Sequence, residues 1–389
     1  MKPIWALIAL AIGAFAIGTT EFTPMGLLPV IASGIDVSIP TAGMLITAYA
    51  LGVMIGAPIM TLALSRFPTK KALMLLMGIF VVGNLLSVIA PGYWTLLISR
   101  LITSLNHGAF FGLGSVLAAS LVPKEKQASA VATMFLGLTI ANIGGVPAAT
   151  WIGQQIGWRM AFAITAVLGL VAIAALAITL PKGKAGQMPN VRAELKVLTR
   201  PAVLMALATT VMGAGAMFTL YTYVAPVLAT LTGASSAFIT LGLVLIGVGF
   251  TLGNAIGGRM ADWSLEGSTK IFLALLAAVM LILPLALTHH VGAAIGLLVW
   301  GIVTFAIVPP VQIRVMQAAH DAPGLAASVN VGAFNLGNAL GAAVGGAVIS
   351  AGLGYAAVPV AGAALAAAGL LLVLANRSGK QPVVQIETV

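Results

Sequence analysis

Residues 181–200 read PKGKAGQMPNVRAELKVLTR, which is a long polar stretch near the middle of a chain of 389 residues. On either side of it, apolar runs alternate with short connections such as SRFPTK and APGY, whose Gly, Pro and Ser are typical of turns. The position of this stretch predicts that residues 182–200 link two halves, residues 1–181 and residues 201–389.

The composition places the chain in a membrane. Hydrophobic residues make up 60% of the sequence and charged residues only 7%, with a mean hydropathy of +1.13. A soluble domain carries about 25% charged residues. A helix of about 20 apolar residues is long enough to cross a bilayer. We therefore expect an all-α integral membrane protein with twelve transmembrane helices, six in each half, at residues 4–32, 41–64, 72–90, 94–121, 128–152, 159–180, 202–231, 236–260, 270–288, 292–312, 324–349 and 355–375.

The basic residues predict the orientation of these helices. If both termini are cytoplasmic, 16 of the 18 Lys and Arg residues lie in cytoplasmic segments, as the positive-inside rule requires. They are Lys2, Arg66, Lys70, Lys71, Lys124, Lys126, Lys182, Lys184, Arg192, Lys196, Arg200, Arg259, Lys270, Arg314, Arg377 and Lys380. The lipid bilayer thus accounts for the net charge of +10, and no nucleic-acid partner is needed. The first apolar run has no small-residue cleavage site, so we expect an uncleaved helix.

The two halves resemble each other in sequence. Residues recur after 197 positions in the second and eighth spans and after 196 positions in the fifth and eleventh. The matching pairs are Gly52 and Gly249, Gly56 and Gly253, Asn142 and Asn338, and Gly145 and Gly341. The offset equals the distance between the halves, which indicates two parallel, pseudo-symmetric repeats.

Small residues at four-residue spacing fall on the same spans, for example Gly249, Gly253 and Gly257. Small faces let the backbones of membrane helices approach closely. Two interpretations are open: tight static packing, or smooth surfaces on which the two halves rock.

Glu21, in the stretch 17–29 (IGTTEFTPMGLLP), is the only acidic residue that we place inside a span. A carboxylate at the centre of a membrane helix costs about 2.5–3.5 kcal/mol on insertion scales. It could be an N-cap or half of a structural pair, or it could bind protons or substrate. We favour a proton or substrate site.

Several stretches resemble one family: GTTEFTPMGLLPVIA at 18–32, RLITSLNHGAFFGLGS at 100–115 and GLTIANIGGVPAATWIGQQIGWRMAF at 137–162. Over its whole length the chain resembles the major facilitator superfamily, and within it the twelve-helix drug:proton antiporters of the arabinose-efflux-permease type. The resemblance implies the major facilitator fold and alternating access. We expect a multi-pass protein of the bacterial inner membrane that acts as a monomer.

The family signature that follows the second and eighth spans is degenerate here. TLALSRFPTKK keeps Arg66 but has Ser65 where the family has Asp, whereas GRMADWS keeps the Asp as Asp262. In the family this Asp caps a helix and pairs with a nearby Arg, which latches the cytoplasmic side. The resemblance therefore implies that Arg66 and Asp262 act as a latch, although Asp262 could also be a solvated cap.

In the fifth span, the family's antiporter signature survives only as Gly144, Gly145 and Pro147. Pro147 removes a backbone donor and bends a helix, while the glycines let a neighbour approach. We expect a hinge here, and its likeness to exporters favours efflux.

The fourth span holds Arg100 and His107, which are seven residues apart and share a helix face. The resemblance implies a role for Arg100 in proton coupling. By depth in the membrane, Glu21 could meet either residue if the first and fourth spans are adjacent. His107 could relay protons, since the ordinary pKa of histidine lies near neutrality. It could instead be a hydrogen-bonded structural residue.

If the family fold holds, the first, fourth, seventh and tenth spans line a substrate cavity. The candidate wall residues are Asn106, Phe110, Phe111, Thr219, Tyr221, Tyr223, Trp300 and Thr304. Aromatic walls with scattered hydroxyls suit an amphipathic organic solute, although single aromatics in membrane helices also simply face lipid.

We conclude that the chain is a proton-coupled secondary transporter that exports small amphipathic organic molecules, either drugs or sugar-like metabolites. The sequence shows no acidic ring or His–carboxylate cluster for a metal, no phosphate-binding loop for ATP and no hydrolase elbow. We therefore expect no enzyme activity, and the proton gradient in place of a cofactor. The alternatives are a sugar or sugar-alcohol facilitator, a membrane enzyme, or a non-transporting sensor on the same scaffold.

Overall fold

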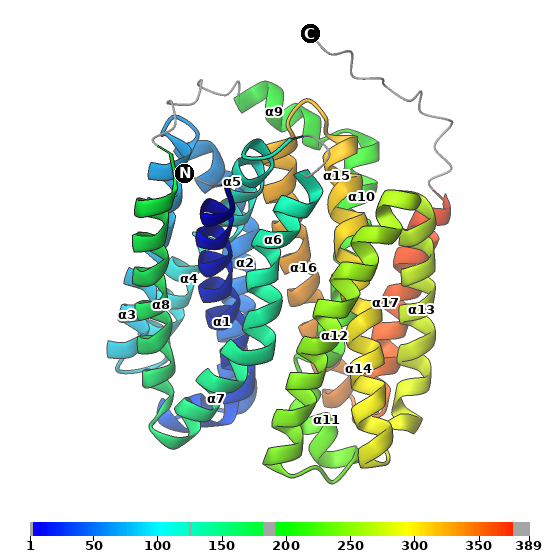
Figure 1. Ribbon diagram of the computed structural model, residues 1–389. Helices are drawn as coiled ribbons and strands as arrows, with labels where there is room; N and C mark the ends of the chain where they lie inside the picture. Colours follow the sequence, from blue (N-terminus) through cyan, green and yellow to red (C-terminus); the bar gives the residue numbers. More distant parts are fainter. Residues whose placement is uncertain (1–2, 124–126, 182–190, 376–389) are drawn as a thin grey trace.

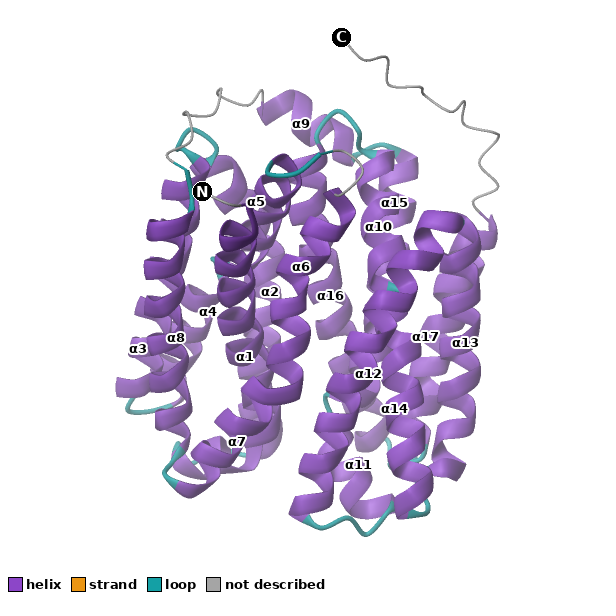
Figure 2. Cartoon of the chain, in the orientation of Figure 1, coloured by secondary structure: helices purple, strands orange, loops and turns teal. Residues whose placement is uncertain are grey.

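A computed structural model describes residues 3–123, 127–181 and 191–375, which are helical apart from short connections (Figure 2). The basic residues Lys2, Lys124, Lys126, Lys182, Lys184, Arg377 and Lys380, residues 182–190 of the predicted linker and the C-terminal tail lie outside these ranges. In the first half, the helices are α1 (Pro3–Gly34), α2 (Ile39–Leu64), α3 (Thr69–Ile89), α4 (Tyr93–Ser104), α5 (His107–Ser120), α6 (Gln127–Ile140), a π-helix (Ala141–Gly145), α7 (Val146–Gln155) and α8 (Trp158–Thr179).

A short linker helix, α9 (Val191–Leu198), precedes the second half. The helices of that half are α10 (Pro201–Tyr221), α11 (Val224–Leu231), α12 (Ser236–Trp263), α13 (Leu265–Ala286), α14 (His290–Ala306), α15 (Val308–Ala318), α16 (Pro323–Ser350) and α17 (Ala357–Ala375). The helix α9 lies at one end of the molecule, which we call the linker end (Figure 1).

The prediction of twelve membrane spans is confirmed. Within the described residues, twelve helical segments are long and apolar enough to cross a bilayer, and their bounds follow the predicted ones closely. The seventh span differs most, because its continuous segment ends at Tyr221 and the rest of the predicted range is the separate helix α11. The ninth span begins earlier than predicted, at Leu265, and the tenth extends further, to Ala318. Polar and charged residues occupy both places, so hydropathy alone ended the predicted spans too soon.

Four of the spans are interrupted, and they are the fourth, fifth, seventh and tenth. The fourth breaks at 105–106, the seventh at 222–223 and the tenth at Ile307, while the fifth contains the π-helix. Proline contributes in two cases, because Pro147 lies in the first turn of α7 and another proline lies in the first turn of α15. The backbone bends at these breaks, in the spans that carry most of the candidate site residues.

The helices form two bundles that stand side by side, α1–α8 and α10–α17 (Figure 1). Each bundle has its own large hydrophobic cluster. Between the bundles, α16 packs on α2 and α5, and α12 packs on the π-helix and α6. Hydrogen bonds between described residues cross this seam: Thr61 donates to Ser328 over 3.0 Å, and Tyr221 donates to Asn142 over 2.8 Å.

The rows of small residues serve packing within each bundle. A Cβ on Gly249 would lie 2.6 Å from a carbonyl oxygen of α14, and one on Gly337 would lie 2.6 Å from a carbonyl oxygen of α10. Gly145 likewise faces α1, and Gly56 faces Leu105. In this arrangement these rows therefore pack within a bundle, and their use as surfaces on which the halves rock stays a prediction. Other glycines lie at the seam, among them Gly247, whose Cβ would lie 2.8 Å from the backbone of the π-helix.

Candidate functional site

Glu21 lies in the interior of α1, far from either end of the helix, and only 4% of it is exposed. The N-cap interpretation is therefore wrong. Its neighbours Thr19 and Thr23 give their hydroxyl protons to carbonyls of their own helix, at Phe15 and Thr19. Because both hydroxyl protons are used within α1, these threonines do not donate to the Glu21 carboxylate, and its neighbours come from other helices.

Glu21 lies near a histidine of the same bundle, and that histidine contacts a tyrosine. The Nε2 atom of His107, at the start of α5, lies 3.9 Å from Oε2 of Glu21. On the other side of the ring, Nδ1 of His107 lies 3.1 Å from the hydroxyl of Tyr49 on α2. The Glu21–His107 distance is too long for a hydrogen bond. A small movement would let the carboxyl and the imidazole share a proton.

Arg100 on α4 completes this buried group, and 1% of it is exposed. Its Cζ atom lies 4.2 Å from the centre of the Tyr49 ring and 5.7 Å from that of Phe162, which are cation–π distances. All three guanidinium nitrogens lack a hydrogen-bond partner among the described residues. The ion pair between Arg100 and Glu21 that the sequence allowed is not formed in this conformation, because Arg100 stacks on Tyr49 instead.

Two of the predicted cavity residues belong to the interior of the first bundle. Asn106 directs its amide toward the sulfur of Met77 on α3, 3.8 Å away, and the Phe110 ring packs against Gly13 on α1. The structure therefore places both side chains against helices of their own bundle, and their role in a cavity wall stays a prediction. The break after α4 sets the rotation of α5, and α5 packs on α1 and α3.

Phe111 stacks on Phe135 with ring centres 5.0 Å apart, and its ring lies 5.2 Å from that of His107. It therefore packs beside His107, between α5 and α6 of the first bundle.

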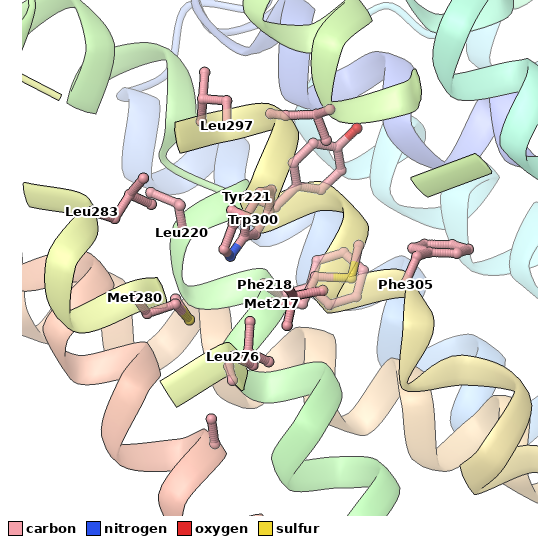
Figure 3. Packing of buried hydrophobic residues seen from close by; sticks show 14 of the residues in the cluster. Met217, Phe218, Leu220, Tyr221, Leu276, Met280, Leu283, Leu297, Trp300 and Phe305 are labelled. Atoms are coloured by element: carbon pink, nitrogen blue, oxygen red, sulfur yellow. The ribbon is translucent and has the colours of Figure 1, made fainter. Parts of the chain in front are cut away.

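The second bundle contributes an aromatic cluster at the seam. Tyr221 on α10 and Trp300 on α14 lie with ring centres 6.2 Å apart, among Phe218 and other apolar side chains (Figure 3). From the first bundle, Phe22 joins them at 5.7 Å from Tyr221. Because the Tyr221 hydroxyl also donates to Asn142, this cluster touches both bundles.

Two polar groups beside this cluster have no partner. The indole Nε1 of Trp300 and the hydroxyl of Thr304 are buried without a hydrogen bond in the described part of the chain. By contrast, Thr219 donates to the carbonyl of Gly215 in its own helix, and Tyr223 donates to the carbonyl of Ala342. Thr219 and Tyr223 thus have their hydrogen-bond partners inside the second bundle, and their role in a cavity wall stays a prediction.

The sequence reasoning missed Tyr49, Phe22 and Phe218, and it used Asn142 only as a repeat marker. The position of Phe22 could have been predicted. It follows Glu21 directly on the helix, so its side chain points about 100° away from that of Glu21 and toward a different neighbouring helix. Tyr49 stands in an ordinary apolar stretch, and nothing in its surroundings marks it.

The predicted latch residues are both exposed. Asp262 lies in the last turn of α12, while α13 is capped by Ser264, whose side chain accepts from the backbone N–H of Gly267. The expectation that Asp262 caps a helix is therefore wrong. Neither Asp262 nor Arg66 forms an ion pair with another described residue.

The predicted hinge residues lie at the end of the π-helix and in the first turn of α7. Gly145 packs on Phe15 and Thr19 of α1, whereas Gly144 is exposed. Pro147 follows directly.

Comparison with known proteins agrees with this architecture. The family model described as the Major Facilitator Superfamily matches residues 10–330. The inner membrane transport protein YdhP of Escherichia coli K12 is 65% identical over 382 residues, which cover 98% of both chains. AraJ of the same organism is 33% identical over 382 residues and 96% of each chain, and the MFS-type transporter YtbD of Bacillus subtilis is 38% identical over 88% of each. The chain therefore belongs to the major facilitator superfamily and is a multi-pass transporter of the inner membrane, as its resemblance in sequence implied.

Proposed function

We propose that this transporter is a proton-coupled exporter of small amphipathic organic molecules, cationic or neutral, which works by alternating access. The observation that carries the proposal is the buried group of Glu21, His107, Tyr49 and Arg100, placed one residue away from the aromatic cluster at the seam.

Arg100 favours proton coupling, because its charge is buried without a hydrogen-bond partner among the described residues. A buried cation without a hydrogen-bonded partner is unfavourable in a membrane, so an anion should approach it at some stage of the transport cycle. The carboxylate of Glu21 is the acidic group of this site. When Glu21 is protonated, Arg100 stays stacked on Tyr49; when Glu21 loses its proton, it can move toward Arg100 or bind a cationic solute. Protons and solute then compete for one carboxylate, as antiport requires.

The aromatic cluster at the seam favours an amphipathic solute. Phe22 follows Glu21 on α1 and meets the rings of Phe218 and Tyr221. A solute that enters between the bundles would stack on these rings. It could also satisfy the free Nε1 of Trp300 and hydroxyl of Thr304, while a positive charge on the solute would face Glu21.

We also propose the following assignments. Both termini are cytoplasmic, which puts the linker end and its basic residues on the cytoplasmic side. Residues 182–200 join two six-helix halves, and one chain forms the working unit. Arg66 and Asp262 act in closing the cytoplasmic side, and Gly144, Gly145 and Pro147 form a hinge in the fifth span, where a π-helix already interrupts the regular backbone.

The test of coupling is Glu21→Gln in reconstituted vesicles, with a fluorescent cationic dye as the probe solute. Gln keeps the shape and hydrogen-bonding capacity of the side chain but cannot titrate. We expect Glu21→Gln to lose accumulation driven by a pH gradient and to retain exchange of labelled for unlabelled solute. Glu266→Gln is the matched control, because Glu266 is an exposed carboxylate that pairs with Lys270. Accumulation that still follows the pH gradient in Glu21→Gln would place coupling elsewhere, first at His107.

The direction of transport needs its own test. Overexpression should lower, and deletion should raise, the cellular content of the solute. If overexpression instead speeds the uptake of a sugar down its gradient with no response to pH, the facilitator alternative is correct.

A further inference from the structure

A groove of about 780 Å³ lies on the outer side of the first bundle, away from the seam. Its floor is one face of α3, where Lys71, Leu75, Gly78 and Val82 follow each other at spacings of four, three and four residues. The walls include Ile102 of α4 and Ile173 of α8, the two helices that pack beside α3. Apart from its lysine end, the groove is apolar.

The length of this face fits one leaflet of a bilayer. From Lys71 to Val82 the helix rises about 16 Å, at 1.5 Å per residue. Half of a hydrocarbon core is about 15 Å thick. The lysine end lies at the linker end of the molecule, because Leu62, at the end of α2, packs in the same cluster as Val197 of α9. The groove therefore runs from the membrane surface to the middle of the bilayer.

Both lysines at the mouth of the groove are held in place but not neutralised. Lys70 donates to the carbonyls of Ala177 and Leu180 at the end of α8, over 2.6 and 2.9 Å. The Nζ atom of Lys71 lies 5.1 Å from the centre of the Phe67 ring, and the guanidinium of Arg66 lies 5.4 Å from the same ring. None of these three cations forms an ion pair with another described residue.

The corresponding lysine of the second bundle, Lys270, has an acidic partner. Lys270, near the start of α13, pairs with Glu266 one turn earlier, over 2.6 Å. The start of α3 has no such acid, and its N-cap is Pro68, which provides no side-chain acceptor. The positive charge at the mouth of the groove is therefore available to a ligand from outside the chain.

We propose that this groove binds an anionic phospholipid, with its phosphate at Lys70 and Lys71 and one acyl chain along the face of α3 that ends at Val82. The charge at the mouth selects an anionic headgroup, and the apolar floor and walls exclude a soluble anion as the whole ligand. Basic side chains at a membrane surface contribute on the order of 1 kcal/mol each to the binding of anionic lipids, which is about five-fold in affinity. Retention of such a lipid would tie α3, α4 and α8 together without occupying the transport path.

The test is native mass spectrometry of the purified full chain, titrated with phosphatidylglycerol or with phosphatidylcholine of the same acyl chains. We expect the wild type to retain phosphatidylglycerol at least about five-fold better. Lys71→Gln should remove about five-fold of that affinity and leave phosphatidylcholine binding unchanged. Gly78→Phe should weaken the binding of both lipids, since a Cβ at Gly78 meets no atom within 4 Å and the ring would fill the groove.

Two controls match these variants. Lys270→Gln removes a lysine that already has an acidic partner, and Gly43→Phe adds a ring at another open helix position, on α2. Both should retain lipid like the wild type. Equal retention of the two lipids by the wild type, or wild-type retention by both Lys71→Gln and Gly78→Phe, would overturn the proposal. Release of the bound phosphatidylglycerol by inorganic phosphate alone would also overturn it, because the lysines would then bind a free anion.

Discussion

The hydrogen bond from Tyr221 to Asn142 crosses the seam, so its removal should change how often the two bundles adopt the present arrangement. Tyr221→Phe removes the hydroxyl and keeps the ring in the aromatic cluster. Hydrogen bonds between membrane helices contribute about 0.6 kcal/mol on average and about 1.7 kcal/mol at most. If the bond exists only in this arrangement, its loss reduces the population of this arrangement relative to the alternatives by about 3- to 18-fold.

Double electron–electron resonance can measure this change. The chain has no cysteine, so spin labels at Gln154→Cys on α7 and Thr230→Cys on α11 report without background. Both positions are exposed. Their helices lie on opposite sides of the seam, at the end of the molecule away from the linker end (Figure 1). In the Tyr221→Phe background, the distance peak that belongs to the present arrangement should lose population to a second peak.

The control is Tyr223→Phe, which removes a hydroxyl bonded to Ala342 inside the second bundle. It should lower the thermal stability of the protein without moving population between the peaks. If Tyr221→Phe leaves the distance distribution as it is in the wild type, the seam bond persists in every state, and the reasoning fails. If Tyr221→Phe does shift the population between the two peaks, adding Asn142→Ala should cause no further shift, because both changes remove the same hydrogen bond.

Three further outcomes follow from described contacts. Arg200 donates a hydrogen bond to Asp321, which lowers the pKa of that carboxyl below its ordinary value of 3.8. The stability that this contact contributes is therefore fully present above pH 3.8 and is lost as the pH falls through the lowered pKa. The difference in melting temperature between the wild type and Asp321→Asn should persist above pH 3.8 and disappear over that acid range. Gly253→Val should destabilise the protein by at least about 1–3 kcal/mol, because its side chain would meet a carbonyl of α14, whereas Gly258→Val, in open space, should melt like the wild type. Asp262→Asn should slow turnover in vesicles while the affinity for solute stays the same, and unchanged turnover would remove Asp262 from the closing step.

The fold was predictable because each membrane helix is encoded locally. A run of about 20 apolar residues suffices to define a span, and short connections leave few ways to arrange consecutive helices. The breaks were only partly predictable. Pro147 predicted the interruption of the fifth span. The interruption at 105–106 has no proline, and the sequence there is typical of a continuous helix. Such a break depends on how α4 and α5 pack against other helices.

The site was predictable where a residue is out of place in a membrane. Glu21, Arg100 and His107 stand out by their charge, and the structure brings all three into one buried group. Their partners were less visible. Phe110 lies toward α1 instead of the seam, because the direction of a side chain depends on the rotation of its helix, which hydropathy does not encode. The stacking of Arg100 on Tyr49 likewise joins two spans that no spacing rule connects.

The charged site lies entirely in the first bundle, although the two bundles repeat the same architecture. In the described part of the chain, the buried ionisable Glu, Arg and His side chains are those on α1, α4 and α5, while the buried polar residues of the second bundle are Thr, Ser and Asn. If the bundles arose from one duplicated ancestor, the two copies have since diverged in their buried polar residues. Under the proposed function, the first copy would take up and release protons and the second would contact the solute. The second copy could then change its solute while the first keeps the coupling to protons.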